Sequence, residues 1–359
     1  MTHPHRLATA LVICLLSCVS LFGNPRAANA GTFYVATDGS DGNPGSYDAP
    51  WATIQLAVSQ LTAGDTLYIR GGVYSSPSQN VDSQAAYVPS GNSWWDPITI
   101  AGYPGETVTI MPPNNYPGLR LTWGQPHYLI FQDLALDMSL QADDFDPMVA
   151  DKVEAIYVAS GAHHLRFQRL DIGYTMSNAI QWSTHEAGQY SSYLELLDSR
   201  IHHAGQTTRD SGHGGPGINN GYGIYLFTDD NLVQGNEFYS NCGIAINAYG
   251  NRNVISYNTA YGNGTRGGPA PAINIGSSAY PGMTNNTLVD GNVVFGNRAG
   301  VQIYSNTVNT VVSNNTIYAN QVDGLLLAYF DSVYLRNNAV YGNGESDVRN
   351  EGGGAVYEE

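Results

Sequence analysis

The C-terminal half of the chain repeats a short pattern of polar and apolar positions. Each unit begins with an asparagine, has an aromatic residue three positions later, and has a second asparagine five positions later. Five units begin at Asn236, Asn258, Asn292, Asn315 and Asn338, at steps of 22, 34, 23 and 23 residues. After three of the units, at 243–246, 300–303 and 324–327, a glycine precedes apolar residues at alternate positions. This alternation predicts short strands with one buried face.

A period near 22 residues is too short for two packed helices per repeat, but it suits one coil of three short strands. Asparagine tolerates left-handed backbone, and its amide can bond the coils above and below, so each asparagine column predicts a ladder. Ile244, Ile246, Val301 and Ile303 are expected to stack in the core. We therefore predict an all-β fold, a single-stranded right-handed parallel β-helix over residues 31–345. A leucine-rich solenoid is the main alternative, but no Leu-x-x-Leu-x-Leu spacing repeats.

Both ends of the chain differ from the coils. Apolar residues in 51–62 fall at helical spacing, which predicts a short N-terminal capping helix over the open end of the core. Residues 346–359 are acidic and glycine-rich, which indicates a loose tail or a weak terminal cap.

The first 30 residues have the pattern of a secretory signal peptide. Arg6 precedes an apolar run over 7–22, and 28–30 form a small-x-small cleavage site. We expect a secreted or periplasmic protein that begins near Gly31, with lipoprotein cleavage before Cys18 as the alternative. The apolar run is too short and too early for a spanning helix, so no membrane insertion is expected.

Composition narrows the possible partners. Of 359 residues, 14 are basic and 30 are acidic, for a net charge of −16. This balance argues against nucleic acid and against anionic lipid, which need clustered lysine and arginine. Cys242 is the only cysteine beyond the signal, so no internal disulfide is expected. We expect a monomer.

The N-terminal segments 33–45, 50–55 and 64–74 resemble the start of exported bacterial β-helix proteins, among them the family 9 polysaccharide lyases, which include pectate lyases. The resemblance implies a pectate-lyase-like solenoid that acts on a polysaccharide, with an acidic glycan favoured. It also implies calcium held by aspartates and a lysine base. Lys152 is the only lysine and lies in an acidic insertion, so the chain departs from the lysine-base mechanism.

Two long coils indicate where substrate could bind. Extra residues at 205–221 and 265–286 leave the coils at the same turn and flank one coil without an insertion. They predict two walls of a groove with Glu237, Tyr239 and Ser240 on its floor. The predicted substrate-binding residues are Glu237, Asp210, Tyr261 and Tyr225.

Candidate catalytic groups gather beside this groove. Alternation along the strands places Arg200 and His202 on the same face as Glu237 and Tyr239. An anionic sugar needs a cation for its carboxylate, a base and an acid. Arg200 or Arg209 suits the first role. The base and acid are expected among His202, His203, His213 and Tyr239. In the alternative interpretation, the paired histidines are turn and ladder residues only.

These residues favour a polysaccharide lyase that cleaves a uronate-containing glycan by β-elimination. The alternative is a non-catalytic glycan-binding or cell-surface β-helix protein. Residues 211–215 and 228–230 resemble pieces of the polygalacturonase hydrolases, but in reversed order, so a lyase is favoured over a glycoside hydrolase.

Oxygen-rich segments suggest calcium as a cofactor. The predicted ligands are Asp143, Asp144 and Asp146, and a second, shorter candidate contains Asp38, Asp41 and Asn43. Solvated acidic loops are the alternative for both. The repeated aromatic column, from Tyr239 to Tyr341, predicts either a platform for sugar rings or a ladder that stiffens the coils.

Overall fold

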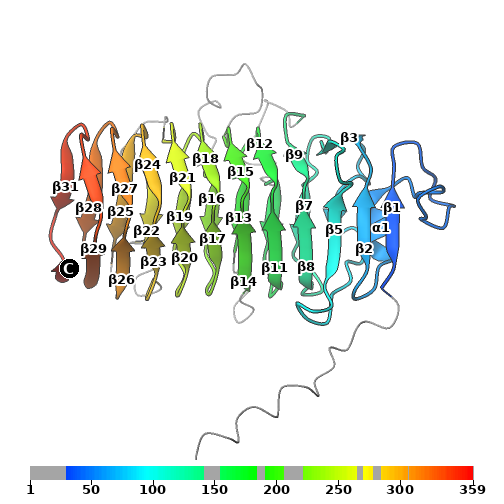
Figure 1. Ribbon diagram of the computed structural model, residues 1–359, viewed down its shortest axis with the longest axis horizontal. Helices are drawn as coiled ribbons and strands as arrows, with labels where there is room; N and C mark the ends of the chain where they lie inside the picture. Colours follow the sequence, from blue (N-terminus) through cyan, green and yellow to red (C-terminus); the bar gives the residue numbers. More distant parts are fainter. Residues whose placement is uncertain are drawn as a thin grey trace, which may run out of the picture.

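The computed structural model describes residues 30–140, 154–183, 191–205, 221–264, 270–277, 284–305 and 307–358. In these residues, short strands stack as coils along one long axis (Figure 1). The coils run from β1 (Thr32–Val35) and α1 (Ile54–Ser59) at one end to β31 (Ser346–Asn350) at the other. The pairings between named strands are parallel.

The named strands of the described ranges form three sheets, which we call A, B and C. Sheet A contains β1 (Thr32–Val35), β2 (Thr66–Ile69), β5 (Ile98–Gly102), β8 (His127–Gln132), β11 (His163–Gln168), β14 (Ser192–Leu197), β17 (Leu232–Gln234), β20 (Val254–Ser256), β23 (Leu288–Asp290), β26 (Thr310–Ser313), β29 (Ser332–Arg336) and β32 (Ala355–Glu358). Sheet B contains β3 (Gly72–Tyr74), β6 (Val108–Ile110), β9 (Ala135–Asp137), β12 (Asp171–Gly173), β15 (Arg200–His202), β18 (Glu237–Tyr239), β21 (Thr259–Tyr261), β24 (Val293–Phe295), β27 (Thr316–Tyr318) and β30 (Ala339–Tyr341). Sheet C contains β4 (Val81–Asp82), β7 (Leu119–Leu121), β10 (Ile156–Val158), β13 (Ile180–Trp182), β16 (Ile224–Leu226), β19 (Ile246–Ala248), β22 (Pro271–Ile275), β25 (Ala299–Tyr304), β28 (Asp323–Ala328) and β31 (Ser346–Asn350).

The hydrophobic core is a continuous column inside the three sheets. Because side chains alternate along a strand, each coil contributes its inward residue to the same column. In sheet B, Phe238, Ala260 and Val294 are fully buried and stack on one another. The predicted parallel β-helix is therefore confirmed. Ile244 is an exception to the predicted core, since it is only half-buried and Ala245 is buried beside it.

The predicted asparagine ladder is present. Asn236 Nδ2 donates to Asn258 Oδ1 at 3.0 Å, and Asn258 Nδ2 donates to Asn292 Oδ1 at 3.0 Å. A second ladder, from Asn241 to Asn343, ends where Asn343 Nδ2 donates to Asp347 Oδ1 at 3.0 Å. Buried amides in these turns therefore satisfy one another from coil to coil.

The two ends of the described chain are built differently. The predicted capping helix is confirmed as α1, whose Ile54, Ala57 and Val58 are buried at the first coil, although it is shorter than 51–62. Of the two alternatives predicted for 346–359, a loose tail and a weak terminal cap, the loose tail is wrong for the described residues 346–358. There β31 pairs with β28 and β32 pairs with β29, so the chain adds strands to sheets C and A.

Some predictions concern segments that the structure does not describe. Within the described ranges, no helix has the length and apolar character needed to cross a bilayer. The predicted signal peptide falls almost entirely in residues 1–29, outside the described residues. Cys242 is buried with its thiol free.

Candidate functional site

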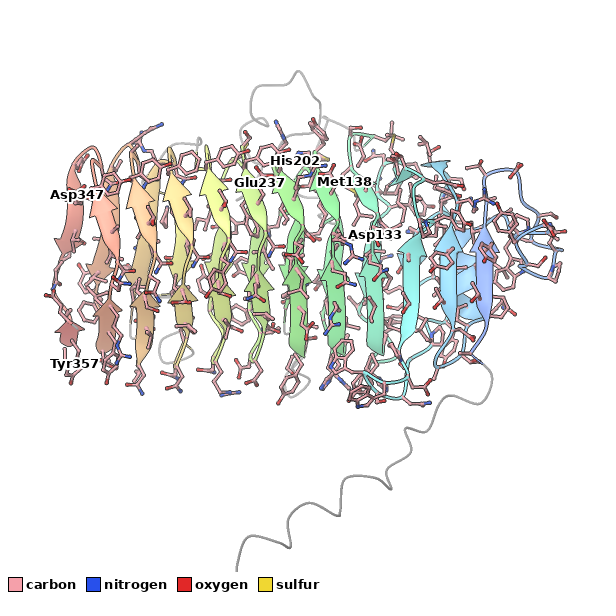
Figure 2. The ribbon with its side chains drawn as sticks, in the orientation of Figure 1. Asp133, Met138, His202, Glu237, Asp347 and Tyr357 are labelled. Carbon is pink, nitrogen blue, oxygen red and sulfur yellow. The ribbon has the colours of Figure 1, made fainter. Side chains whose placement is uncertain are left out.

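Of the predicted catalytic and substrate-binding residues that the structure describes, all but Tyr225 lie on sheet B or directly after one of its strands. Arg200 pairs with Glu237 on the next coil, and His202 pairs with Tyr239. Ile201, between Arg200 and His202, is fully buried in the core. Figure 2 shows His202 and Glu237 on neighbouring coils at the same edge of the molecule. The predicted register of these four residues is therefore confirmed.

His202 occupies the centre of a hydrogen-bonded chain of three side chains. Its Nε2 lies 3.2 Å from Asp171 Oδ1, and its Nδ1 lies 2.8 Å from His203 Nδ1. Arg200 Nη2 donates to the other carboxylate oxygen of Asp171 at 2.8 Å. The structure therefore adds Asp171, which sequence reasoning missed, to the predicted Arg200, His202 and His203.

The direction of these hydrogen bonds follows from the chemistry of the groups. An ionised carboxylate can only accept, so His202 Nε2 carries the hydrogen that points to Asp171. In a neutral His202, Nδ1 then has a lone pair, and the short Nδ1–Nδ1 contact requires His203 Nδ1 to donate. His203 Nε2 is left with a lone pair, and it has no hydrogen-bond partner among the described residues. In this arrangement of hydrogen bonds, His203 Nε2 is left as an acceptor.

Burial and charge support this assignment. The hydrogen bond from His202 and the positive charge of Arg200 lower the pKa of Asp171 and keep it ionised. Burial lowers the pKa of His203. A lowered pKa keeps the His203 imidazole neutral near pH 7, which is the form that can accept a proton.

Tyr239 supplies a hydroxyl beside the two histidines. Its ring stacks on His202 with centroids 5.0 Å apart and meets His203 edge-on at 5.8 Å. Burial raises the pKa of Tyr239, so its hydroxyl stays protonated. No described residue hydrogen-bonds that hydroxyl. Tyr261 differs, since its hydroxyl donates to Glu237 Oε1 at 2.8 Å.

The aromatic column continues from Tyr239 as a stack of rings. Centroids of successive rings lie 5.2 to 5.5 Å apart, with interplanar angles of 7° to 13°. Each ring therefore covers the face of its neighbour and presents only its edge to solvent. This geometry supports the interpretation of a stiffening ladder over that of a sugar platform.

The turn beside the histidines has left-handed backbone, as other turns of the described coils do. His203 and Tyr174 have left-handed φ values of 53° and 59°, and they stack on each other at 5.0 Å. Left-handed backbone costs a side chain with a Cβ about 1–2 kcal/mol. The following coils place Ser240 and Gly262 at this turn position. The left-handed conformation therefore belongs to the turn and does not by itself mark a functional site.

Gly173 makes room for the His202 ring. A Cβ at Gly173 would lie 2.6 Å from His202 Nδ1 and 2.9 Å from Nε2, and closer still to Cε1. These separations are far below van der Waals contact. The absence of a side chain at Gly173 therefore allows His202 to reach Asp171 and His203 at once.

The structure separates other predicted residues from this site or does not describe them. Tyr225 lies on β16 in sheet C, so it does not share the face of His202. The predicted insertion 265–286 contains β22, so it is not one wall as expected. Six predicted site residues lie outside the described residues, namely Arg209, Asp210, His213, Asp143, Asp144 and Asp146.

In the second calcium candidate, Asp41 and Asn43 make contacts within the loop. Asp41 Oδ1 accepts from the backbone N–H groups of Ala52 and Thr53 at 2.9 Å each, and Asn43 donates to Pro50. In the described residues, no group of three or more His, Cys, Asp or Glu side chains is arranged to hold a metal ion.

Comparison with known proteins places this geometry in a family. The family model for the Pel9A-like, right handed beta helix region matches residues 33–338. Pectate lyase PEL9 of Emericella nidulans is 43% identical over 84 residues, which cover 23% of this chain and 19% of that protein. The chain therefore matches about a fifth of the length of this relative.

Several solved structures share the fold. Pectate lyase Pel9A has a TM-score of 0.57 and 15% identity, covering 90% of this chain and 79% of its own. The lacto-N-biosidase of Eubacterium ramulus has a TM-score of 0.63 and 12% identity, covering 92% and 67%. The mannuronan C-5 epimerase AlgE6 A-module of Azotobacter vinelandii has a TM-score of 0.55 and 17% identity, covering 79% and 71%. At these identities the likeness shows the fold alone.

The fold of these relatives agrees with the predicted right-handed parallel β-helix. The family match extends from the first strand of sheet A almost to the last coil and includes the range from Asp171 to Tyr239. The chain therefore belongs to the Pel9A-like, right-handed β-helix family.

Proposed function

We propose that the protein is an exported polysaccharide lyase that cleaves a uronate-containing glycan by β-elimination. The proposed site of cleavage is the hydrogen-bonded set of side chains Asp171, His202 and His203. The observation that carries the proposal is the pair of contacts, at 3.2 Å and 2.8 Å, that link Asp171, His202 and His203 and from which the lone pair at His203 Nε2 is inferred. Family membership supports it, since two similar proteins are named pectate lyases. The predicted signal peptide supports export.

In β-elimination, a base removes the proton from the sugar carbon next to the carboxylate. The C–H electrons form a carbon–carbon double bond as the neighbouring glycosidic C–O bond breaks. In this proposal, His203 Nε2 takes the proton. Its Nδ1 proton can shift to His202 Nδ1, which moves the positive charge next to the Asp171 carboxylate. The hydrogen-bond chain thus stabilises the protonated base.

The leaving oxygen needs a proton, and the Tyr239 hydroxyl is the proposed donor. Its raised pKa keeps it protonated, and its ring is held against His202 by stacking. After product release, His203 returns its proton to solvent and Tyr239 regains one. Glu237 and Tyr261 are proposed to contact sugar hydroxyls rather than to transfer protons, since their side chains bond each other.

Charge neutralisation of the substrate is the role proposed for Arg200. Its side chain is 57% exposed and uses Nη2 on Asp171, which leaves other N–H groups for a carboxylate. Asp171 and Glu237 flank it, so further positive charge is needed. We propose that Arg209, and calcium bound at Asp143, Asp144 and Asp146, supply this positive charge. The proton transfers by His203 and Tyr239 do not depend on them.

The test compares His203→Gln with the wild type on polygalacturonate and alginate, with calcium or with chelator. Formation of the unsaturated product is followed by ultraviolet absorbance. We expect a rate loss of about 10²- to 10⁴-fold, as for removal of a general base. Tyr329→Phe, an exposed residue far along the coils, is the matched control. Full activity of His203→Gln would refute the assignment. No product from the wild type on either glycan would favour the non-catalytic glycan-binding alternative.

A further inference from the structure

A tight hairpin between β4 and β5 carries two adjacent tryptophans at its tip. Asp96 N donates to Ser93 O at 3.0 Å, and Asn92 Nδ2 donates to Asp96 Oδ2 at 2.7 Å. Trp94 and Trp95 occupy the two turn positions between Ser93 and Asp96. The two rings have opposite environments.

Trp94 anchors the hairpin to sheet A. The Arg166 guanidinium lies 4.8 Å from the centre of its ring, which is within cation–π range. Arg166 is itself paired with Glu195. The Trp94 ring also meets Tyr128 edge-on, with centroids 5.6 Å apart. These contacts fix the hairpin against the coils, so its tip is a rigid platform.

Trp95 is 84% exposed, the largest exposed fraction among the large hydrophobic side chains of the described residues. It therefore contributes little to the core, and its ring faces are open to solvent. This distinguishes it from the stacked column on sheet B, where each ring covers the next. A rigidly presented, open indole is a ready contact for a ligand with an apolar face.

Beside the hairpin, a row of polar aromatic side chains follows the helix axis. Tyr128 and His164 have ring centroids 4.7 Å apart, and His164 and Tyr193 have centroids 4.6 Å apart. All three residues have left-handed φ values of 52° to 54°. The next two coils place Asp230 and Arg252 at this position. The row thus lies at a turn position whose left-handed backbone continues in the following coils.

We propose that Trp95 and the row Tyr128–His164–Tyr193 form a second polysaccharide-binding site that does not take part in cleavage. A pyranose ring has a face of C–H groups and a rim of hydroxyls. The open face of Trp95 matches the face of C–H groups. The hydroxyl and imidazole groups of the row match the rim of hydroxyls, because they donate and accept hydrogen bonds. Successive groups of the row lie about one coil apart.

The site is separate from the Asp171–His202–His203 chain. Its residues lie at the starts of β8, β11 and β14 in sheet A, whereas His202 lies at the end of β15 in sheet B. In the shared orientation of the figures, these starts are at the lower edge and His202 is near the upper edge (Figures 1 and 2). The inference rests on the proposed function only in taking a polysaccharide as ligand.

A protein partner fits this surface less well. Docked protein surfaces need a contiguous apolar area. The hairpin residues beside Trp95 include the polar Asn92 and Asp96, and the row that Trp94 contacts is also polar. The observations therefore favour a sugar over a second protein chain.

The test measures binding rather than cleavage. Wild type, Trp95→Ala and the exposed-aromatic control Tyr329→Ala are compared by affinity electrophoresis in gels that contain polygalacturonate, alginate or xylan. Tryptophan emission is recorded in parallel. For at least one glycan we expect Trp95→Ala to weaken binding about tenfold, the loss of 1.4 kcal/mol typical of an anchor residue, and to abolish the emission change. Tyr329→Ala should bind like the wild type.

Each outcome bears on one proposal only. Equal binding by Trp95→Ala and wild type, or no binding of any of the three glycans, would overturn the second site. His203→Gln should keep the Trp95-dependent binding while losing cleavage. If cleavage is absent in the wild type but Trp95-dependent binding persists, the proposed lyase function fails and the second site stands.

Discussion

Substitution of Gly173 by alanine should break the hydrogen bonds that link Asp171, His202 and His203 without changing any of these three residues. The added methyl group would lie 2.6 Å from His202 Nδ1 and 2.9 Å from Nε2, where ordinary contact needs more than 3.4 Å. The backbone at Gly173 is ordinary strand, so alanine causes no conformational strain of its own. The His202 ring must therefore move and lose its bonds to Asp171 and His203.

The size of the effect follows from those contacts. Overpacking commonly costs about 1–3 kcal/mol, and a hydrogen bond to a charged group contributes about 1.5–3 kcal/mol. We expect Gly173→Ala to lower the free energy of unfolding by about 3 kcal/mol. Activity should fall about as far as in His203→Gln, because the base loses its orientation.

A double-mutant cycle tests the reasoning. In a His202→Ala background the clash is gone, so adding Gly173→Ala should cost less than about 0.5 kcal/mol more. Urea unfolding of the wild type, both single variants and the double variant gives the coupling energy, expected near 2–3 kcal/mol. Equal costs of Gly173→Ala in the two backgrounds, or no cost in the wild type, would show that Gly173 does not act through His202.

Three further predictions concern the ladders and the site. Asn258→Ala should lower the free energy of unfolding by about 2–4 kcal/mol in urea titrations, because it leaves Asn236 N–H and Val233 O buried without partners, whereas an effect under 0.5 kcal/mol would contradict the ladder. Because the pKa of Asp171 is lowered on folding, its stabilisation should be present above about pH 4 and be lost as the pH falls through the lowered pKa. Asp171→Asn should remove that acid-side loss, which a series of unfolding curves from pH 7 to pH 3 would detect. Tyr239→Phe should keep the ring stack and the melting temperature but reduce turnover at least tenfold. Tyr261→Phe, which also loses only a hydroxyl, should leave turnover within about twofold.

The coils could be predicted from the sequence because asparagine marks them. Asn236, Asn258 and Asn292 sit in turns whose backbone and amide requirements few other residues meet, so their spacing reports the coil length directly. Strand register then follows from alternation, which placed Arg200 and His202 beside Glu237 and Tyr239.

Asp171 was missed because its coil lacks that marker. The ladder position is occupied by Ser199 one coil before Asn236, and by Leu170 one coil before that. Asp171 therefore has no asparagine beside it to mark its turn, and its role depends on hydrogen bonds to Arg200 and His202 that sequence spacing does not show. The short contact between His202 and His203 was equally hidden, since it depends on the left-handed backbone of His203.

The strands at the C-terminal end were missed for a different reason. Sheet pairing there uses the backbone, and few apolar side chains reveal it. In β31, the inward position is held by Val348, which is 52% exposed at the end of the core. A glycine-rich, acidic sequence therefore pairs as strands because the preceding coil offers a free edge.

The tautomers of His202 and His203 test the central claim most directly. Long-range ¹H–¹⁵N correlation spectra of labelled protein near pH 7 distinguish protonated from unprotonated ring nitrogens. The hydrogen-bond chain predicts that His202 carries its hydrogen on Nε2 and that His203 carries its hydrogen on Nδ1, with a bare Nε2. A hydrogen on His203 Nε2 in the neutral ring would contradict the proposed base, and with it the proposed chemistry of the site.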